Sequence, residues 1–473
     1  MRSSDPACPD SVLRHSSPCD GESSKRADPS ARRGRRAPSM RGTLMPAMTL
    51  ARPTTRRTFA KAAAAPLMVS ASTLGLGGAT PPSDRIAVAG IGMGSRNRRN
   101  IQEFLDQEDV RVRAVCDLFS DRRVDAKQLV DTHYGDSDCA ATRFHEEVLE
   151  RDDIDAVVIG TGDRWHAVMS SLAAQAGKDA YCEKPFCLTI AEGRQLVEVT
   201  RQYGTVWQCG TQRRSNPGYE FVINAIHGGR IGRLHTVRLS FGATGGWKRN
   251  SFAVPEGEPD AEVFDYDRWL GQAPWAPYSA DRVRYWRLNW DTGAGGVADM
   301  GPHFIETVQW LRGKPLDAPV EYEGEAEFRD EGGINNIPYW YEIRTRYGDG
   351  LRLNMDTGRK GLMFVGDEGW IFLSDTGGID AKPDSVLAGL EPPDANYNIQ
   401  GPHVRDFLTC MRSRQQPASN PEAAHRAHTI AHCANICLRL GRNMRWDAAS
   451  ERFEGDAEAN NMRYRTMRAP WRV

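Results

Sequence analysis

The chain has 473 residues, of which 40% are hydrophobic and 26% are charged, and its formal net charge is −1. This length allows two or three domains, and the apolar share is too high for a wholly disordered chain. The near-neutral balance argues against a dedicated nucleic-acid-binding protein, which usually carries a basic surplus. The charge is uneven, because residues 1–83 hold 13 Lys and Arg against 5 Asp and Glu, whereas the remainder holds 48 against 57. A basic head on an acidic body indicates a targeting segment.

Residues 1–79 are predicted to be a disordered head followed by an export signal. Residues 1–43 are rich in Ser, Pro, Asp and Arg and show almost no apolar periodicity. Residues 54–61 then read T-T-R-R-T-F-A-K and precede a run of small apolar residues. The twin arginines, Phe59 and Lys61 resemble a Tat signal, so we expect the Tat export machinery as a partner and a periplasmic location. A membrane anchor is the alternative, which the Pro and Gly residues of the run disfavour.

The ten cysteines contain no C-x-x-C pair, which argues against a zinc ribbon or a redox motif. Several lie in apolar, strand-like runs, where a free Cys acts as a small hydrophobic residue. We therefore expect no disulfide framework.

Residues 84–210 alternate strand and helix signals. Strands are predicted at 85–90, 110–116, 154–159, 179–182 and 205–209, with helices between them. Alternation of this kind predicts βαβ units and a parallel sheet, so the fold class is α/β with an N-terminal Rossmann domain that binds a dinucleotide.

The first strand ends in a glycine-rich loop that opens a helix. Gly90 permits the tight turn and Gly92 lets the backbone approach a pyrophosphate, whose charge meets the helix N-terminus. The third glycine of the usual pattern is replaced by Ser95, with Gly94 beside it, and Met93 lies within the loop. The strand–loop–helix setting makes this loop a predicted cofactor site.

Asp117 ends the second strand, where a carboxylate accepts hydrogen bonds from the adenosine ribose and repels a 2′-phosphate. This position favours NAD over NADP. NADP stays possible, because Arg122 lies close enough along the chain to reach a 2′-phosphate.

The pattern of predicted strands and helices changes in residues 211–447. Strand candidates at 234–241, 320–328, 339–347, 351–356 and 369–374 follow one another with few helices, which favours an antiparallel sheet in a second α/β domain. Long loops at 242–298 are typical of functional segments, and helices are expected at 403–414 and 421–440. Residues 448–473 form a polar, weakly patterned C-terminal tail.

Two motifs make the prediction specific. A-G-K-D-A-Y-C-E-K-P at 176–185 ends the fourth strand, and G-G-V-A-D-M-G-P-H at 295–303 opens a helix. Together with the glycine loop and the segment from Thr161 to His166, they resemble the Gfo/Idh/MocA oxidoreductases, which include glucose–fructose oxidoreductase and inositol dehydrogenase. The resemblance covers residues 84–447 and implies a Rossmann domain followed by an α/β domain with a large, mostly antiparallel open sheet.

The resemblance implies that Lys184, Asp299 and His303 are the catalytic residues. Lys184 follows a strand at the carboxyl edge of the sheet, where it can hold a substrate hydroxyl and stabilise an alkoxide. Asp299 and His303 are spaced i, i+4, so that Asp299 can orient His303 or anchor a neighbouring hydroxyl. We expect a near-neutral pKa for His303, which suits a general base. Whether Lys184 or His303 takes the hydroxyl proton stays open.

Other residues near these motifs are expected to contact the cofactor. Thr161, His166, Glu183 and Lys184 lie just after the third and fourth strands, and a structural role is the alternative for Glu183. The family commonly has Pro two residues after the position of Thr161, whereas this chain has Asp163.

Aromatic and basic side chains in the long loops before Asp299 are candidates for substrate binding. Aromatic faces stack on sugar C–H surfaces, and Lys or Arg bind hydroxyls or an acid group. The alternative is that these aromatic residues pin the loops to the sheet. The candidates are Trp247, Lys248, Tyr285, Trp286 and Arg287.

A histidine pattern in the late helix does not predict a metal site. His425, His428 and His432 share a face of the late helix, and the i, i+4 pair could chelate a metal. No third ligand of the usual type lies nearby, so we expect packing and no metal site.

The sequence and its family resemblance therefore predict an exported oxidoreductase that transfers a hydride between a sugar, cyclitol or sugar derivative and a tightly held NAD, and the resemblance implies a homo-dimer or tetramer. The tight binding follows because the periplasm offers no replenished NAD pool. The alternative activity is a redox-neutral, NAD-dependent glycosidase that uses transient oxidation, and a non-catalytic sugar-binding protein is a weaker third reading. The expected mature charge of about −9 gives no hint of a nucleic-acid partner.

Overall fold

The computed structural model describes residues 81–241, 254–314, 317–329, 333–395 and 397–471. The head, the Tat-like segment, Trp247 and Lys248 lie outside this part of the chain. Among the described residues, no helix is both long and apolar enough to cross a bilayer.

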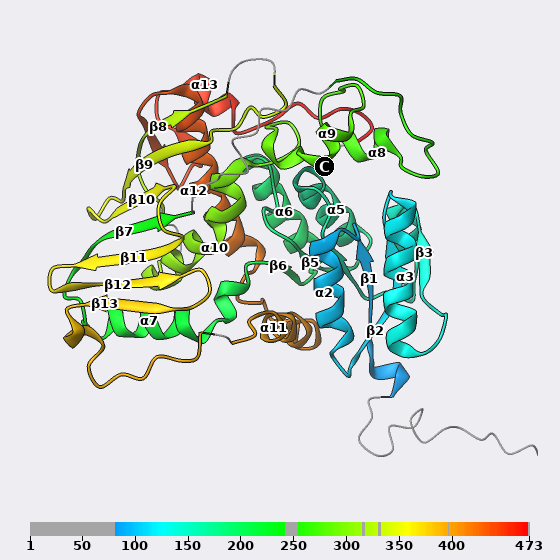
Figure 1. The fold of residues 1–473 in the computed structure, drawn as a ribbon, viewed down its shortest axis with the longest axis horizontal. Helices are drawn as coiled ribbons and strands as arrows, with labels where there is room; N and C mark the ends of the chain where they lie inside the picture. The colour runs from blue at the N-terminus through cyan, green and yellow to red at the C-terminus, as the bar shows by residue number, and fades with distance from the viewer. Residues whose placement is uncertain (1–80, 242–253, 315–316, 330–332, 396, 472–473) are drawn as a thin grey trace, which may run out of the picture. The chain divides into compact units, whose positions relative to one another are not determined.

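The N-terminal domain is built on a six-stranded parallel sheet with the strand order β3-β2-β1-β4-β5-β6 (Figure 1). Its strands are β1 (Ile86–Ile91), β2 (Val110–Cys116), β3 (Ala140–Thr142), β4 (Ala156–Ile159), β5 (Asp179–Cys182) and β6 (Trp207–Cys209). The reversal of strand order beside β1 is the feature that marks a Rossmann domain, so this prediction is confirmed. The edge strand β3 was not predicted, because its three residues are only partly buried and carry no apolar signal.

Helices cover both faces of this sheet, as the alternating pattern predicts. They are α2 (Ser95–Leu105), α3 (Ser120–Tyr134), α4 (His145–Leu149), α5 (Asp163–Gln175) and α6 (Ile190–Tyr203), after a short 3-10 turn η1 (Pro82–Asp84). Apolar residues of α2 and α3 form one core with the sheet, and those of α4, α5 and α6 form another.

The second domain holds a nine-stranded sheet with the order β13-β12-β11-β7-β10-β9-β8-β14-β15. Its strands are β7 (Leu234–Ser240), β8 (Glu321–Glu327), β9 (Trp340–Arg346), β10 (Arg352–Asp356), β11 (Gly361–Gly366), β12 (Gly369–Ser374), β13 (Ile379–Lys382), β14 (Met444–Asp447) and β15 (Arg452–Phe453). Only the pair β7–β10 is parallel within this sheet, which confirms the mostly antiparallel prediction.

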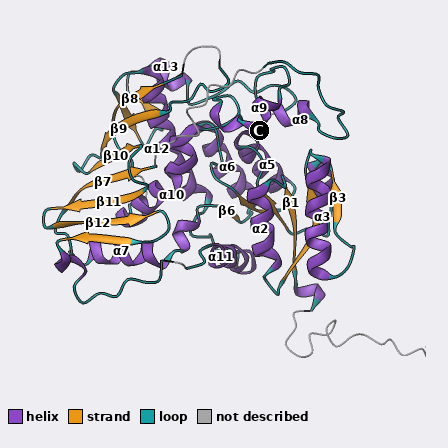
Figure 2. Ribbon diagram, in the orientation of Figure 1, coloured by secondary structure: helices purple, strands orange, loops and turns teal. Residues whose placement is uncertain are grey.

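The helices of the second domain pack on one face of its sheet (Figure 2). They are α7 (Pro217–His227), α8 (Tyr266–Leu270), α9 (Ala280–Arg284), α10 (Gly295–Arg312), α11 (Gln400–Ser413), α12 (Pro421–Leu440) and α13 (Ala457–Asn461), with 3-10 turns η2 (Gln212–Ser215), η4 (Trp286–Leu288) and η5 (Asp384–Leu387). The exceptions are α11, which packs against α2 of the N-terminal domain, and α8 and α9, whose apolar residues form a separate cluster with Leu118 and Phe119 of that domain.

The last part of the chain is folded onto the body. α13 lies within residues 448–471, and the ring of Trp471 stands 5.3 Å from that of Trp165 in α5. The guanidinium of Arg465 lies 4.0 Å from the ring centroid of Trp290. These contacts are polar and aromatic, so the apolar periodicity of the sequence could not predict that this segment packs on the body.

Phe407 of α11 is buried in the N-terminal core, with ring centroids 6.2 Å from Phe104 and 6.1 Å from Tyr181. We expect Phe407→Ala to lower the free energy of unfolding by about 3–5 kcal/mol, because a large buried ring leaves a cavity. Val124→Ala on exposed α3 is the control, with a change within about 0.5 kcal/mol. Urea unfolding measures both, and equal effects of the two substitutions would contradict this packing.

Candidate active site

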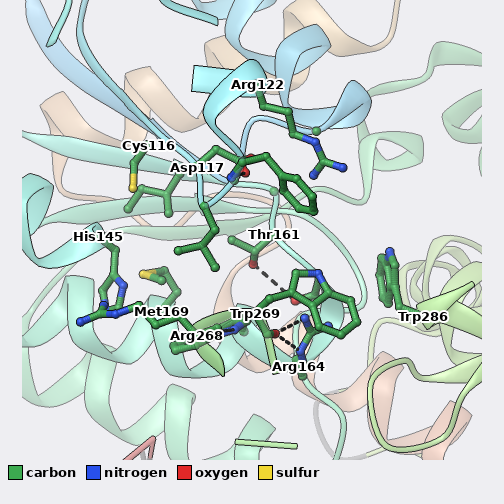
Figure 3. Close-up of a pocket in the computed structure, with 18 of the residues that line it drawn as sticks. Cys116, Asp117, Arg122, His145, Thr161, Arg164, Met169, Arg268, Trp269 and Trp286 are labelled. Atoms are coloured by element: carbon green, nitrogen blue, oxygen red, sulfur yellow. Dashed lines mark hydrogen bonds between the residues drawn. The ribbon is translucent and has the colours of Figure 1, made fainter. Parts of the chain in front are cut away.

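A pocket opens at the carboxyl ends of β1, β2 and β4, where a Rossmann sheet binds its dinucleotide (Figure 3). The N-terminal domain contributes the glycine loop, residues 116–119 with Arg122, and residues 160–162 with Arg164 and Trp165 to its lining. The second domain contributes Arg268, Trp269, Trp286 and Arg287. The pocket is thus closed by the long loop segment that the sequence marks as functional.

The glycine loop forms the sharp turn predicted for it, but Gly92 and Gly94 have other roles than those predicted from the sequence. Gly92 has φ +79°, and a Cβ there would lie 2.6 Å from Thr161 Cγ2, so the close approach expected of Gly92 is to the loop after β4. Gly94 precedes α2 and lines the pocket, with nothing within 4 Å of an added Cβ. Gly94 is therefore the position at which a pyrophosphate can meet the helix N-terminus.

Asp117 is buried at the end of β2 and holds the loop in place. Its Oδ2 accepts the Met93 N–H at 2.5 Å, and its Oδ1 accepts the Phe119 N–H at 2.9 Å. Burial raises the pKa of Asp117, although Arg122 and these N–H donors oppose that effect. The guanidinium of Arg122 lies over the Phe119 ring at the same end of the pocket, 3.9 Å from its centroid.

Glu183 is nearly fully buried at the end of β5. Its Oε1 accepts hydrogen bonds from Arg96 Nε at 2.8 Å, Asn100 Nδ2 at 3.2 Å and Gln212 Nε2 at 3.2 Å. Burial alone would raise the pKa of Glu183, but Arg96 and Lys184 hold it below its ordinary value. Arg96 also lines the pocket, so the ion pair aims a cation toward the cofactor cleft from the first turn of α2.

Lys184 and Asp299, both expected to be catalytic, form an ion pair across the two domains. Lys184 Nζ lies 3.0 Å from Asp299 Oδ1 and 2.9 Å from the Asp299 carbonyl oxygen. Burial would raise the pKa of Asp299, but Lys184 and Arg287 lower it below its ordinary value. Asp299 therefore stays ionised and holds the amino group of Lys184 beside α10.

His303 lies one turn further along α10 and is buried. Burial, and then the cation of Arg213, lower the pKa of His303 well below its ordinary value. The near-neutral pKa expected for this residue is therefore wrong. The sequence does not reveal the contribution of Arg213 to this lowered pKa, because Arg213 lies 90 residues earlier in η2.

Three residues that the sequence analysis missed complete this side of the site. Arg213 Nη1 donates to His303 Nε2 at 3.1 Å, and its other amino group donates to Asp375 after β12. Lys360, just before β11, lies 2.6 Å from the other oxygen of Asp375. These residues come from chain segments without a motif, so only the folded sheet brings them together.

Asp163 is a fourth missed residue, and it stands where the family commonly has Pro. It is the first residue of α5, and its Oδ2 accepts the Ala294 N–H at 3.1 Å, just before α10. Burial raises the pKa of Asp163 to about 7; Arg287 opposes the shift and Asp299 adds to it. The departure from the family pattern was the available signal for this residue.

The remaining candidates fall into two groups. His166 Nδ1 lies 2.7 Å from the Pro185 carbonyl oxygen, beside Lys184, and burial lowers its pKa to about 4. Trp286 and Arg287 line the pocket, with the guanidinium 4.2 Å from the centroid of the indole ring. Tyr285 ends α9 next to them and is not among the residues that line this pocket.

The histidines of α12 make ordinary structural contacts. His425 Nε2 lies 2.8 Å from Glu451 Oε1, His428 Nε2 accepts the Phe186 N–H at 3.3 Å, and His432 Nε2 lies 3.2 Å from the Cys187 carbonyl oxygen. No group of three potential ligands within the described residues is arranged to hold a metal ion.

Family models match both domains. The NAD-binding Rossmann fold of the oxidoreductase family matches residues 85–211, and the C-terminal α/β domain of that family matches residues 225–473. The chain belongs to the Gfo/Idh/MocA oxidoreductase family. Its N-terminal domain is the NAD-binding domain of that family.

Solved structures share the fold at low sequence identity. The aldose–aldose oxidoreductase from Caulobacter crescentus, in complex with glycerol, aligns with a TM-score of 0.58 and 16% identity over 76% of this chain and 99% of that one. An oxidoreductase from Agrobacterium radiobacter, in complex with NAD+, L-tartaric acid and magnesium, aligns with a TM-score of 0.53 and 16% identity over 77% and 99%.

Curated relatives match a shorter stretch. A glycosyl hydrolase family 109 protein from Shewanella pealeana is 30% identical over 186 residues, which are 38% of this chain and 40% of the relative. An α-N-acetylgalactosaminidase from Shewanella oneidensis is 31% identical over 163 residues, which are 33% and 34%. The chain thus matches two fifths or less of the length of these relatives.

Two glycine substitutions separate the folding of the loop from its binding role. Gly94→Ala should weaken NAD binding about tenfold or more at an unchanged thermal midpoint, since the methyl group enters open pocket space. Gly92→Ala should lower both the NAD affinity and the thermal midpoint, because the positive φ of Gly92 and its close approach to Thr161 leave no room for a side chain. Fluorescence titration with NAD and thermal unfolding measure the two effects.

Gly135→Ala is the matched control, since Gly135 has φ +71° at the end of α3, away from the pocket. It should lower the thermal midpoint and leave NAD affinity unchanged. Full NAD affinity in Gly94→Ala would contradict the assigned path of the cofactor.

Asp163→Asn should change how stability depends on pH. The folded-state pKa of about 7 lies above the ordinary 3.8, so the folded protein keeps a proton that the unfolded chain has lost. Wild-type stability therefore falls as pH rises from about 4 to about 7, and the variant lacks this loss. Urea unfolding across that range should show the free energy of unfolding of the variant rising relative to that of the wild type as pH rises. A difference in free energy that is constant with pH would exclude the shifted pKa.

Proposed function

We propose that the chain transfers a hydride at a CH–OH carbon of a sugar, cyclitol or sugar derivative. The observation that carries this proposal is the Lys184–Asp299 ion pair, 3.0 Å between Nζ and Oδ1, at the carboxyl end of β5 beside the NAD-binding pocket. That edge of a doubly wound sheet is where the reactive end of a dinucleotide lies. The names of the relatives support a carbohydrate as the substrate class.

The pocket suits NAD in its charge and shape. Gly94 leaves open space at the N-terminus of α2, Arg96 lines the pocket while paired with Glu183, and Asp117 ends β2 at the position where a carboxylate binds the adenosine ribose. When bound, NAD supplies the acceptor or donor of the hydride.

The side chains of the site divide the remaining work. Lys184 Nζ contacts the substrate oxygen: as the neutral amine it takes the hydroxyl proton on oxidation, and as the ammonium so formed it returns that proton on reduction. Asp299 keeps the amino group in place and adds a hydrogen-bond acceptor for a neighbouring hydroxyl. Trp286 and Arg287 supply an aromatic face and a cation on the side of the long loops.

A redox-neutral glycosidase is the second candidate. The observation that favours it is the 30% identity to a glycosyl hydrolase family 109 protein over 186 residues. The same residues would serve it, because the oxidation is temporary and the net reaction is hydrolysis of a glycosidic bond. The products distinguish the two candidates: a freed sugar without net NADH, or a ketosugar or lactone.

Export is part of the same proposal. The T-T-R-R-T-F-A-K segment at 54–61 and the basic head support passage through the Tat machinery, which moves folded proteins. A folded precursor can carry NAD with it, which favours a cofactor that stays bound and is regenerated within each catalytic cycle.

Lys184→Met should lower turnover about 100-fold or more, the usual loss when an acid–base group is removed. NAD affinity should change little, since the substitution removes an amino group that contacts the substrate oxygen. Turnover is measured with glucose, myo-inositol and p-nitrophenyl N-acetyl-α-galactosaminide, with NADH absorbance and released nitrophenol read separately. Lys314→Met, on the surface, is the control. Full activity of Lys184→Met would exclude the assigned role.

Replacing Arg56 and Arg57 by Lys should abolish export, because Tat recognition depends on the arginine pair and not on charge alone. Cell fractionation of a Tat-competent bacterium measures the distribution, with Arg52→Lys as the control outside the motif. Undiminished export of the double variant would rule out this route.

A further inference from the structure

His303 is held by a chain of side chains that reaches from the sheet to the active site. Lys360 and Arg213 bind opposite oxygens of Asp375, and Arg213 in turn donates from Nη1 to His303 Nε2 at 3.1 Å. Asp375 is mostly buried, and the side chain of Arg213 is only 13% exposed. The guanidinium is therefore fixed from one side by a carboxylate and presents its other side to the imidazole.

This contact determines which ring nitrogen of His303 carries the proton. A guanidinium has donors and no lone pair that can accept, so the nitrogen facing it must be the acceptor. Nε2 is that nitrogen, and the proton of the neutral ring therefore lies on Nδ1. Among the described residues, Nδ1 is buried and has no hydrogen-bond partner.

The charges around the ring oppose a second proton. Burial lowers the pKa of His303 most, and the cations of Arg213 in η2, Lys184 after β5, Arg96 in α2 and Lys360 before β11 lower it further. The carboxylates nearest to these cations are already bound to them: Asp375 to Arg213 and Lys360, Asp299 to Lys184, and Glu183 to Arg96.

We propose that Arg213 is a positioning residue that locks His303 in the neutral Nδ1–H form, so that His303 donates a hydrogen bond to the substrate oxygen and does not remove its proton. The free Nδ1–H is the donor that this role requires. The proton on the substrate oxygen moves to and from Lys184 Nζ, and His303 keeps its own proton throughout. This inference rests on the proposed function for the substrate oxygen as the hydrogen-bond acceptor, but the tautomer and charge of the His303 ring do not depend on turnover.

The ring is tested directly by long-range ¹H–¹⁵N spectra of deuterated protein labelled with ¹⁵N-histidine. The signals of His303 are identified by their loss in His303→Gln. We expect the neutral Nδ1–H tautomer without titration between about pH 5 and 8, the range in which a free imidazole changes charge. In Arg213→Met the same signals should titrate or shift toward the Nε2–H tautomer.

Arg214→Met is the matched control, since Arg214 lies in the same 3-10 turn but stacks on Trp310, 4.5 Å from its ring centroid. It should leave the His303 signals unchanged. An Nε2–H or protonated ring in the wild type would overturn the proposal even if Arg213→Met fails to fold. Unchanged signals in a folded Arg213→Met would overturn it as well.

The role of the ring is tested by turnover of the same three compounds. His303→Gln keeps a donor but no base, so we expect its rate to stay within about tenfold of the wild type, with an unchanged pH profile. A loss of about 100-fold or more would assign His303 as the base and overturn the donor role. Absence of turnover in the wild type would count against the proposed function, while the spectra would still decide the state of the ring.

Discussion

Glu183 is a charge buried at the centre of the molecule, and much of the site is arranged to compensate it. An unpaired buried carboxylate costs several kcal/mol, so the fold must bring donors to it. Those donors come from the first turns of α2 and from η2, while Gln400 of α11 accepts from Arg96 Nη2 at 2.9 Å. The requirement to satisfy one carboxylate thus joins the glycine loop, the end of β5 and the second domain at a single point.

The catalytic geometry follows from that junction. Lys184 is the next residue after Glu183, so the anchored carboxylate also sets the position from which the ammonium reaches Asp299. η2 carries Gln212 to Glu183 and the adjacent Arg213 to His303. One buried anion therefore places both the group that handles the proton and the group that fixes the imidazole.

The parts that could be predicted from sequence are those with a period or a motif. Alternating strands and helices predicted the Rossmann domain, and the two motifs singled out Lys184 and Asp299, which the structure brings into contact. Arg213 and Asp375 could not be found in this way, because neither belongs to a pattern and only the folded sheet brings them beside His303. The pKa of His303 was misjudged for the same reason, since it depends on burial and on cations distant in the chain.

The central claim is that the pocket at β1, β2 and β4 holds NAD for chemistry at Lys184. Native mass spectrometry of the purified, folded protein tests it most directly, followed by denaturation to release and identify any nucleotide. We expect the mass of the chain plus one NAD, and NAD in the released fraction. A chain at its bare mass that also fails to bind added NAD would exclude NAD as the occupant of this pocket.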